Sequence, residues 1–381
     1  MLSFKTLSVL DESVDKEKLE SINYFLKLMD INKNDSIYDS LFKNIDIISS
    51  VPLKITSIKK LNKGKYGLIL KGCLEIETTN KKYSECNYPI ILKIIGYRKK
   101  TSNEYETLSI DNKTRPENVE WEIHTLIYNL LSSKQSIPHT SWPFLSLMVN
   151  IKKNNFLHIL LKEENFKPNT LKNFYKINFC EYISLGTIEE YFIKFKNKNA
   201  SKEILHILFQ VLMTLAIIQE KYPSFIHNDL HTKNVLLKDV DKKTTISYEL
   251  NNKIYKIKNI GFITILNDFD FSEIKPSITN SKTNTFFGKN RVLKGYTDVY
   301  RFTGALLDLI SEYGIKVKSD IGKFIFSISL ADEILDFDQP IFRGVSRKEK
   351  EQLAFNVKKN NKFIPYKLIK RKIFKEIISN S

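Results

Sequence analysis

A polar loop at residues 227–234, enclosed by apolar residues on both sides, constrains this chain more than any other part of its sequence. It reads His-Asn-Asp-Leu-His-Thr-Lys-Asn, with Asp229 and Asn234 five positions apart. Phosphoryl transfer uses a carboxylate that accepts the attacking hydroxyl's proton and an oxygen ligand for magnesium. The spacing therefore predicts Asp229 as catalytic base and Asn234 as metal ligand. The alternative is an ordinary polar turn between a helix and a strand.

A second acidic residue, Asp268, follows an apolar run at 263–266 and precedes Phe269. A strand fixes the carboxylate at its end, and the phenylalanine is expected to pack beneath it. An isolated Asp-Phe pair carries little information. Its place after Asn234 in the chain makes Asp268 the candidate for a second magnesium ligand.

Two glycines, Gly64 and Gly67, flank Tyr66 between two strand-like runs. Glycines let the backbone approach phosphates closely, where its N–H groups meet their charge. Gly64, Tyr66, Gly67 and the following Ile69 are therefore expected to contact ATP. A simple hairpin turn explains the same residues as well.

Lys93 ends the apolar run at 90–92, from which its side chain can reach the α- and β-phosphates of ATP. An acidic residue on the expected helix at 117–131 has to hold it there. Glu122 is the choice, because it precedes Leu126 by one turn near the apolar face, and Glu120 is the alternative.

A strand-to-turn segment around residue 180 is the candidate for the hinge that binds adenine. Backbone groups of Glu181 and Ile183 are expected to form hydrogen bonds with the base, and Cys180 to line the back of its pocket. Taken alone, this segment could be any strand-to-helix turn.

Hydrophobic periodicity predicts an α+β protein with two lobes. Residues 1–50 are expected to form a helical extension. Short β-type runs and the helix at 117–131 indicate a small β-rich lobe over 51–183. Residues 184–381 read as a compact, mainly helical lobe with an insert at 238–262.

Composition adds expectations about partners and compartment. The net charge of +17 attracts acidic proteins, nucleic acid or anionic membranes, although a solvated basic surface explains it too. Cys73, Cys86 and Cys180 form no CxxC pair, which argues against a disulfide framework or zinc site. The longest apolar stretch, 207–218, is too short to span a bilayer. A soluble, intracellular protein is expected.

In this order, the segments resemble those of the eukaryotic protein kinases over about residues 51–310. The patterns G-x-G-x-x-G-x-V, V-A-I-K, H-R-D-L-x-x-x-N and D-F-G correspond to residues 62–69, 90–93, 227–234 and 268–270. Asp298 resembles the residue that supports the catalytic loop from the large central helix.

More narrowly, the run at 266–272 and the compact C-terminal region look like the poxvirus virion serine/threonine kinases, and the insert resembles that of haspin. The resemblance implies a kinase that uses ATP with Mg²⁺ or Mn²⁺ and phosphorylates Ser/Thr hydroxyls, with virion proteins among its substrates. It also implies a location in the host cytoplasm or the virion.

Among the residues that depart from the kinase pattern, three bear on regulation and substrate choice. Asn228 replaces the arginine that pairs with a phosphorylated activation loop, which predicts activity without that phosphate. Asp270 replaces the glycine after Phe269, which should restrict flipping of Asp268. His231 replaces the catalytic-loop lysine, so the choice between Ser/Thr and Tyr stays open.

Two other functions are compatible with parts of the sequence. A small-molecule kinase of the aminoglycoside or choline kinase type suits the segments around Asp229 and Asp268. A non-catalytic pseudokinase scaffold is the other, but the joint presence of Lys93, Asp229, Asn234 and Asp268 argues against it.

Overall fold

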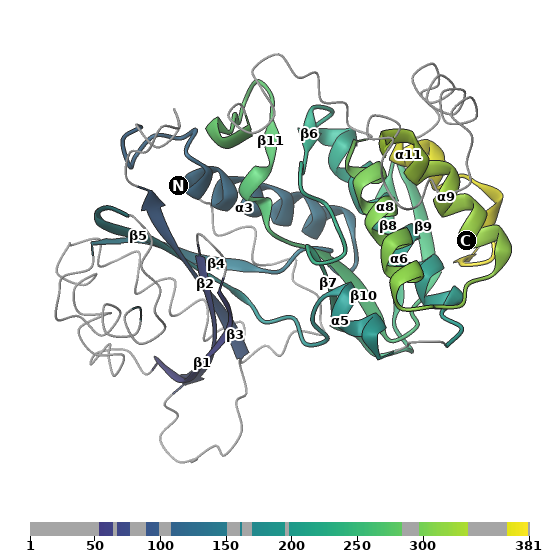
Figure 1. Cartoon of the computed structure of the whole chain (residues 1–381), viewed down its shortest axis with the longest axis horizontal. Coiled ribbons are helices and arrows are strands. Elements are labelled where there is room, and N and C mark those ends of the chain that lie inside the picture. Colours follow the sequence, from purple (N-terminus) through teal and green to yellow (C-terminus); the bar gives the residue numbers. More distant parts are fainter. Residues whose placement is uncertain are drawn as a thin grey trace. The chain divides into compact units, whose positions relative to one another are not determined.

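The computed structural model of this protein describes residues 53–63, 67–76, 89–98, 108–150, 161, 170–194, 198–283, 297–333 and 364–379. These residues form two compact units, whose helices and strands are labelled in Figure 1. The first contains the described residues up to Trp121 together with Trp142–Tyr182. The second contains Glu122–Ser141 and the described residues from Ile183 onward. The extension predicted for residues 1–50 lies outside the described residues.

A five-stranded antiparallel sheet forms the first unit, in the order β1-β2-β3-β5-β4. Its strands are β1 (Leu53–Lys63), β2 (Gly67–Ile76), β3 (Pro89–Arg98), β4 (Pro143–Asn150) and β5 (Thr170–Glu181). This sheet, followed by a mostly helical region, confirms the predicted α+β class.

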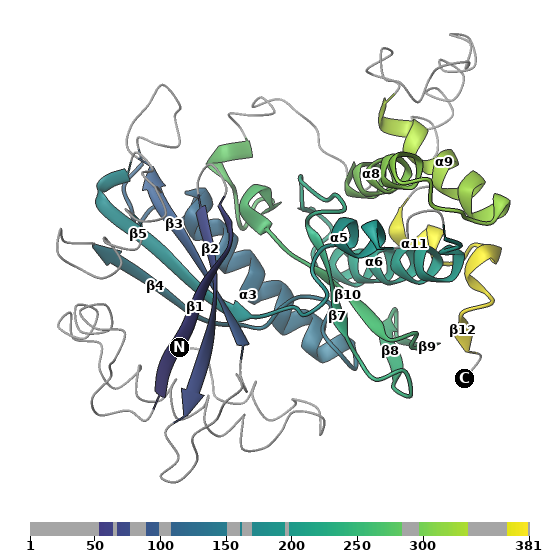
Figure 2. The same cartoon turned by 60° about the horizontal axis from the view of Figure 1, so that its bottom comes forward.

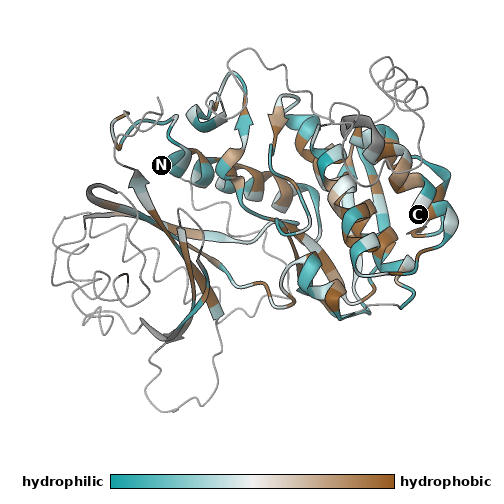
Figure 3. Ribbon diagram, in the orientation of Figure 1, coloured by the Kyte–Doolittle hydropathy of each residue, from teal (hydrophilic) through white to brown (hydrophobic). Residues whose placement is uncertain are grey.

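Strand β3 shows why the sheet forms where the apolar runs are. Ile90, Leu92 and Ile94 are buried, whereas Ile91 and Lys93 between them are partly exposed. Successive side chains of a strand point to opposite faces, so this alternation places one face of β3 in the core. In Figure 3 the strand is coloured mostly as hydrophobic. Lys93 thus projects from the less buried face.

Helix α3 (Pro116–Lys134) begins in the first unit and continues in the second. Proline in the first turn suits this start, because the missing N–H would have no partner there. Residues 122–141, placed in the first lobe from sequence, cluster with the second unit.

The second unit is built from helices and short β-ladders. The helices are α5 (Ile188–Ile193), α6 (Ser201–Lys221), α8 (Thr297–Glu312), α9 (Ser319–Glu333) and α11 (Pro365–Leu368), with 3₁₀ turns η3 (Phe269–Phe271) and η6 (Lys372–Phe374). The strands are β6 (Phe225–Ile226), β7 (Val235–Asp239), β8 (Thr245–Leu250), β9 (Lys253–Lys258), β10 (Phe262–Leu266), β11 (Glu273–Ile274) and β12 (Ile378–Ser379).

Helix α6 is the core of this unit. Every residue from Ile204 to Ile218 is buried, and the helix contacts α11, β8 and β10 (Figure 2). By length and composition α6 could cross a membrane, but 89% of its apolar window is buried inside the protein. Core helices of this kind pass the same test, so α6 is interpreted as a core helix.

The predicted insert at 238–262 contains the hairpin β8–β9, and β12 from the end of the chain pairs with β9 to complete a three-stranded sheet. Ile246, Tyr248 and Leu250 of β8 are buried. Strand β8 of the insert thus belongs to the core, whereas most residues of β9 are exposed.

Two of the cysteines differ in their bonding state. Cys73 is disulfide-bonded, whereas Cys180 is a buried thiol. The sequence argued against a disulfide framework, and this bond shows that Cys73 is nevertheless cross-linked. Its spacing in the sequence gives no sign of the pairing.

Candidate active site

The loop between β6 and β7 brings the two predicted catalytic-loop residues together. The side-chain amide of Asn234 donates to the Asp229 backbone oxygen at 2.9 Å and to its Oδ2 at 3.3 Å. Asn234 is buried, and Asp229 is partly exposed. These bonds hold the Asp229 carboxylate where solvent can reach it. A catalytic base has to be accessible in this way to meet its substrate.

A buried carboxylate supports this loop from α8. Asp298 accepts the backbone N–H groups of His227 at 2.7 Å and Asn228 at 2.9 Å. Burial raises the pKa of Asp298 above its ordinary value, while these bonds and Arg301 oppose the rise. Arg301 also donates to the Asn228 backbone oxygen. The supporting role expected for Asp298 is confirmed by these contacts.

Asp268 follows β10 and is held beside the catalytic loop. The backbone N–H of Asn267 donates to the Asn234 oxygen at 3.0 Å, and the His227 ring lies 3.1 Å from the Asn267 oxygen. Asp268 has φ 65° and ψ 69°, a left-handed conformation. Such a backbone is uncommon outside glycine and clusters at functional sites. The next residue, Phe269, is buried against His227.

The donors present fit a hard cation such as Mg²⁺. A carboxylate from Asp268 and an amide oxygen from Asn234 are ligands that Mg²⁺ prefers, and it takes the rest from waters and phosphates. Because the Asn234 nitrogen is bonded to Asp229, its oxygen is the atom left for a metal. In the described part of the chain, no three His, Cys, Asp or Glu side chains cluster as a metal cage.

His231 lies close to the predicted base. Its Nδ1 accepts the Lys233 backbone N–H at 3.2 Å, and its Nε2 is 3.8 Å from Asp229 Oδ1. Burial lowers the pKa of His231, so the neutral ring is favoured. Since Nδ1 accepts a hydrogen bond, the ring proton belongs on Nε2, the nitrogen that faces Asp229.

Lys93 pairs with Glu120, and our choice of Glu122 is wrong. Lys93 Nζ lies 2.5 Å from Glu120 Oε1, and the Glu120 side chain is buried. Glu122 is exposed. Two residues along a helix turn a side chain by about 200°, so only one of these two glutamates can face β3.

The other predicted nucleotide contacts are partly described. Gly64 and Tyr66 lie outside the described residues. Gly67 begins β2, where a Cβ atom would come 3.4 Å from the Ile94 oxygen. Ile69 pairs with Lys93 across β2 and β3.

The hinge candidates lie at and just after the end of β5. The Glu181 backbone N–H donates to the Trp142 oxygen at 3.0 Å, and Ile183 is buried. Burial raises the pKa of the Cys180 thiol, which keeps it un-ionised. The adenine-binding role of Glu181 and Ile183 stays a prediction.

Sequence reasoning missed the residues that anchor the turn after Asp268. Lys282 forms an ion pair with Asp270, and Asn280 donates to the Asp270 and Ser272 backbone oxygens. No local pattern marks these residues. A buried lysine in a segment without apolar periodicity can be recognised only from its partner.

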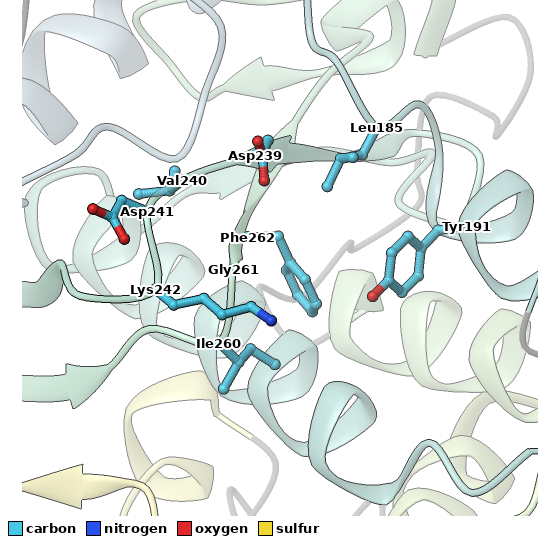
Figure 4. Close-up of a pocket in the computed structure, with 9 residues that line it drawn as sticks. All are labelled: Leu185, Tyr191, Asp239, Val240, Asp241, Lys242, Ile260, Gly261 and Phe262. Carbon is cyan, nitrogen blue, oxygen red and sulfur yellow. The ribbon is translucent and has the colours of Figure 1, made fainter.

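A pocket of about 380 Å³ in the second unit is separate from these groups (Figure 4). It is lined by Leu185, Tyr191, Asp239, Val240, Asp241, Lys242, Ile260, Gly261 and Phe262. Gly261 has φ +111°, and a Cβ there would come 2.9 Å from Lys242 Cε, so glycine lets Lys242 lie across this wall. None of the predicted catalytic or metal-binding residues lines it.

The sequence is similar to those of several viral proteins. It is 26% identical over 248 residues to a protein of Acanthamoeba polyphaga mimivirus named as a serine/threonine-protein kinase, covering 59% of this chain and 51% of the relative. A second mimivirus protein of that name is 33% identical over 145 residues, 36% of each chain. A protein of Invertebrate iridescent virus 3 named as a probable kinase is 26% identical over 226 residues, 55% of this chain and 41% of the relative.

The chain thus spans about half of the first relative and about a third of the second. The family model described as poxvirus serine/threonine protein kinase matches residues 183–379, which include the catalytic loop, Asp268 and Asp298. That is more than half of the sequence, and the residues it covers are those whose geometry suits phosphoryl transfer. The chain belongs to the poxvirus serine/threonine protein kinase family.

Proposed function

We propose that this chain is a protein kinase that transfers the γ-phosphate of ATP to serine or threonine hydroxyls of proteins. The observation that carries the proposal is the contact of Asn234 with Asp229, beside the turn that holds Asp268. A base and two metal ligands at one site are the requirements of phosphoryl transfer. The names of the viral relatives support the choice of a protein substrate.

In this mechanism Asp229 accepts a hydrogen bond from the substrate hydroxyl, orients it, and takes its proton. Asn234 fixes the rotamer of Asp229 and offers its own oxygen, with Asp268, to a divalent ion. That ion, Mg²⁺ or Mn²⁺, neutralises phosphate charge when bound. Lys93, held by Glu120, contacts the α- and β-phosphates. Catalysis is mainly positioning and charge stabilisation.

His231 stands where many kinases carry a lysine. Its Nε2–H lies 3.8 Å from Asp229 Oδ1, beyond hydrogen-bond distance, and is placed to donate to an oxygen of the transferred phosphoryl group. A neutral imidazole supplies a directed hydrogen bond without a full positive charge.

The substrates are proposed to be acidic proteins, virion proteins included, because the chain carries a net charge of +17. Contact with nucleic acid or an anionic membrane is compatible with the same charge. The host cytoplasm and the virion are the compartments in which such substrates meet a viral kinase.

The test is phosphate transfer by the purified chain. We expect transfer from labelled ATP to casein, abolished by EDTA, and none to choline or aminoglycosides. Asp229→Asn should lower turnover by about 10²–10⁴-fold, because a positioned base acts in the transition state, while nucleotide affinity stays similar. Transfer to amino-alcohols but not to protein would favour a small-molecule kinase, and near-normal turnover in Asp229→Asn would remove Asp229 as the base.

A further inference from the structure

The turn that carries Asp268 is bonded to the catalytic loop on one side. The Asn228 side-chain amide donates to the Phe271 backbone oxygen at 3.0 Å, and the Ser272 hydroxyl donates to the His227 oxygen at 3.2 Å. Strand β11 then pairs with β6, with Glu273 opposite Ile226. These bonds fix the exit of the turn relative to the loop that holds Asp229.

A second set of bonds reaches the same turn from residues 280–283. Asn280, which is 1% exposed, donates to the Asp270 oxygen at 2.8 Å and to the Ser272 oxygen at 3.1 Å. Its own oxygen accepts the Lys282 backbone N–H at 3.0 Å. The amide group of Asn280 thus joins the middle of the 3₁₀ turn and the residue that follows it to the backbone of Lys282.

The Lys282 side chain adds an ion pair to these hydrogen bonds. Its ammonium group forms an ion pair with Asp270 Oδ2 and lies 3.5 Å from the centroid of the Phe271 ring. The Lys282 side chain is only 2% exposed, and that of Asp270 is 24% exposed. Lysine is almost never buried without a partner, because removing its charge from water is costly. The pair is therefore a fixed part of the structure.

We propose that Lys282 is a positioning residue: its ion pair with Asp270 holds the strained turn in the conformation that presents Asp268 to the metal. The inference rests on the proposed function. The left-handed backbone of Asp268 is strained for a residue other than glycine, so neighbouring contacts have to maintain it. In this chain the Lys282–Asp270 ion pair ties the turn to residues 280–283.

The test measures metal binding rather than catalysis. Mn²⁺ is titrated into the protein with a non-hydrolysable ATP analogue, and bound Mn²⁺ is followed by electron paramagnetic resonance. Lys282→Met should weaken Mn²⁺ affinity by about 10–100-fold, as loss of residues that orient a metal ligand does. Lys275→Met is the matched control: Lys275 pairs with Glu273 at 3.3 Å in the same segment but does not contact Asp270. Its Mn²⁺ affinity should equal that of the wild type.

A second variant separates positioning from folding. Lys282→Met leaves Asp270 without its cation, so it can also destabilise the unit. Asp270→Asn combined with Lys282→Met removes both charges, and such paired replacement is often nearly neutral for stability. We expect this double variant to unfold at the wild-type temperature and still to bind Mn²⁺ about 10–100-fold more weakly.

The outcomes distinguish the two proposals. If the wild type with the ATP analogue binds no Mn²⁺, the proposed function fails. If the wild type binds Mn²⁺ and the double variant binds it equally well, the proposed function stands and the role of Lys282 is overturned. An equal loss in Lys275→Met would overturn it too, because the effect would then belong to the whole segment.

Discussion

At the scale of single residues, the ion pair between Lys93 and Glu120 gives the sharpest comparison. Glu120→Gln removes the charge that holds Lys93, whereas Glu122→Gln changes an exposed glutamate two positions away. A positioning group displaced by about 1 Å can cost about 10²-fold in rate. We expect kcat/KM for ATP to fall on that order in Glu120→Gln and to stay unchanged in Glu122→Gln, measured by steady-state kinetics. Equal losses in both variants would contradict the pairing.

The same pair shows what sequence could and could not determine. Asp229, Asn234 and Asp268 were predicted together because phosphoryl transfer dictates their residue types and their order. Their contacts in the second unit agree with that prediction. The choice between Glu120 and Glu122 depended on which side of helix α3 each residue occupies. Glu120 precedes Ile123 and Ile127 by three and seven positions, on the buried face, and this signal was available.

Lys282 and Asn280 could not have been predicted by such reasoning. Their partners are backbone oxygens and a carboxylate about ten positions away, reached through an irregular turn. Neither helical nor strand periodicity applies there. Only the departure at Asp270, where a glycine was expected, indicated that the turn is unusual.

At the scale of elements, one histidine joins segments from three parts of the chain. His139 lies before β4, and its ring contacts Thr264 of β10 and Tyr248 of β8, both at 3.1 Å. Its backbone oxygen accepts the Leu266 N–H at 2.8 Å. The insert hairpin is therefore bonded through His139 to the strand that precedes Asp268.

This junction predicts a pH-dependent stability. Burial lowers the pKa of His139 to about 3, whereas its ordinary value of 6.5 applies in the unfolded chain. Between pH 6.5 and about 3 the unfolded state binds a proton that the folded state does not, so stability falls as the pH falls. At pH 5 the loss from His139 is about 2 kcal/mol.

The measurement is the free energy of unfolding in urea at pH 7.5 and pH 5. The difference between the two values should be smaller in His139→Gln than in the wild type by about 2 kcal/mol, because glutamine does not titrate. His206, whose pKa burial lowers to about 4, contributes to both proteins alike. An unchanged difference in His139→Gln would assign the acid sensitivity to other groups.

Elements in which a periodic apolar pattern runs over many residues could be predicted from sequence. Elements that depend on pairing between distant segments could not. The apolar positions of α6 run from Ile204 to Ile218, about four turns, and agree with the mainly helical lobe predicted from sequence. From sequence, the hairpin β8–β9 was predicted only as an insert. The third strand of its sheet, β12, comes from the distant residues 378–379.

At the scale of the whole molecule, the net charge of +17 makes binding to acidic partners depend on salt. The exposed cations Lys367, Lys370, Arg371 and Lys372 lie together near the end of the chain. With a Debye length of about 8 Å at physiological salt, their attraction to a partner is screened. Neutralising these four residues should raise KM for an acidic peptide at low salt and leave KM for a basic peptide unchanged.

The measurement compares the two peptides at 50 and 300 mM salt. The wild type should lose affinity for the acidic peptide as salt rises, while its affinity for ATP changes less. If both peptides respond alike to the substitutions, the charge serves solubility and no docking role remains for these cations.

The pairing of β12 with β9 has a consequence for how the protein is made. Ile378 pairs with Ile257, so about 120 residues have to be synthesised after β9 before its outer edge is covered. At roughly 5–20 residues per second, a ribosome needs about 6–24 s for that length. Throughout this interval β9 presents unpaired backbone groups that another nascent chain can join. Slower translation of this stretch therefore lengthens the period in which newly made copies can aggregate.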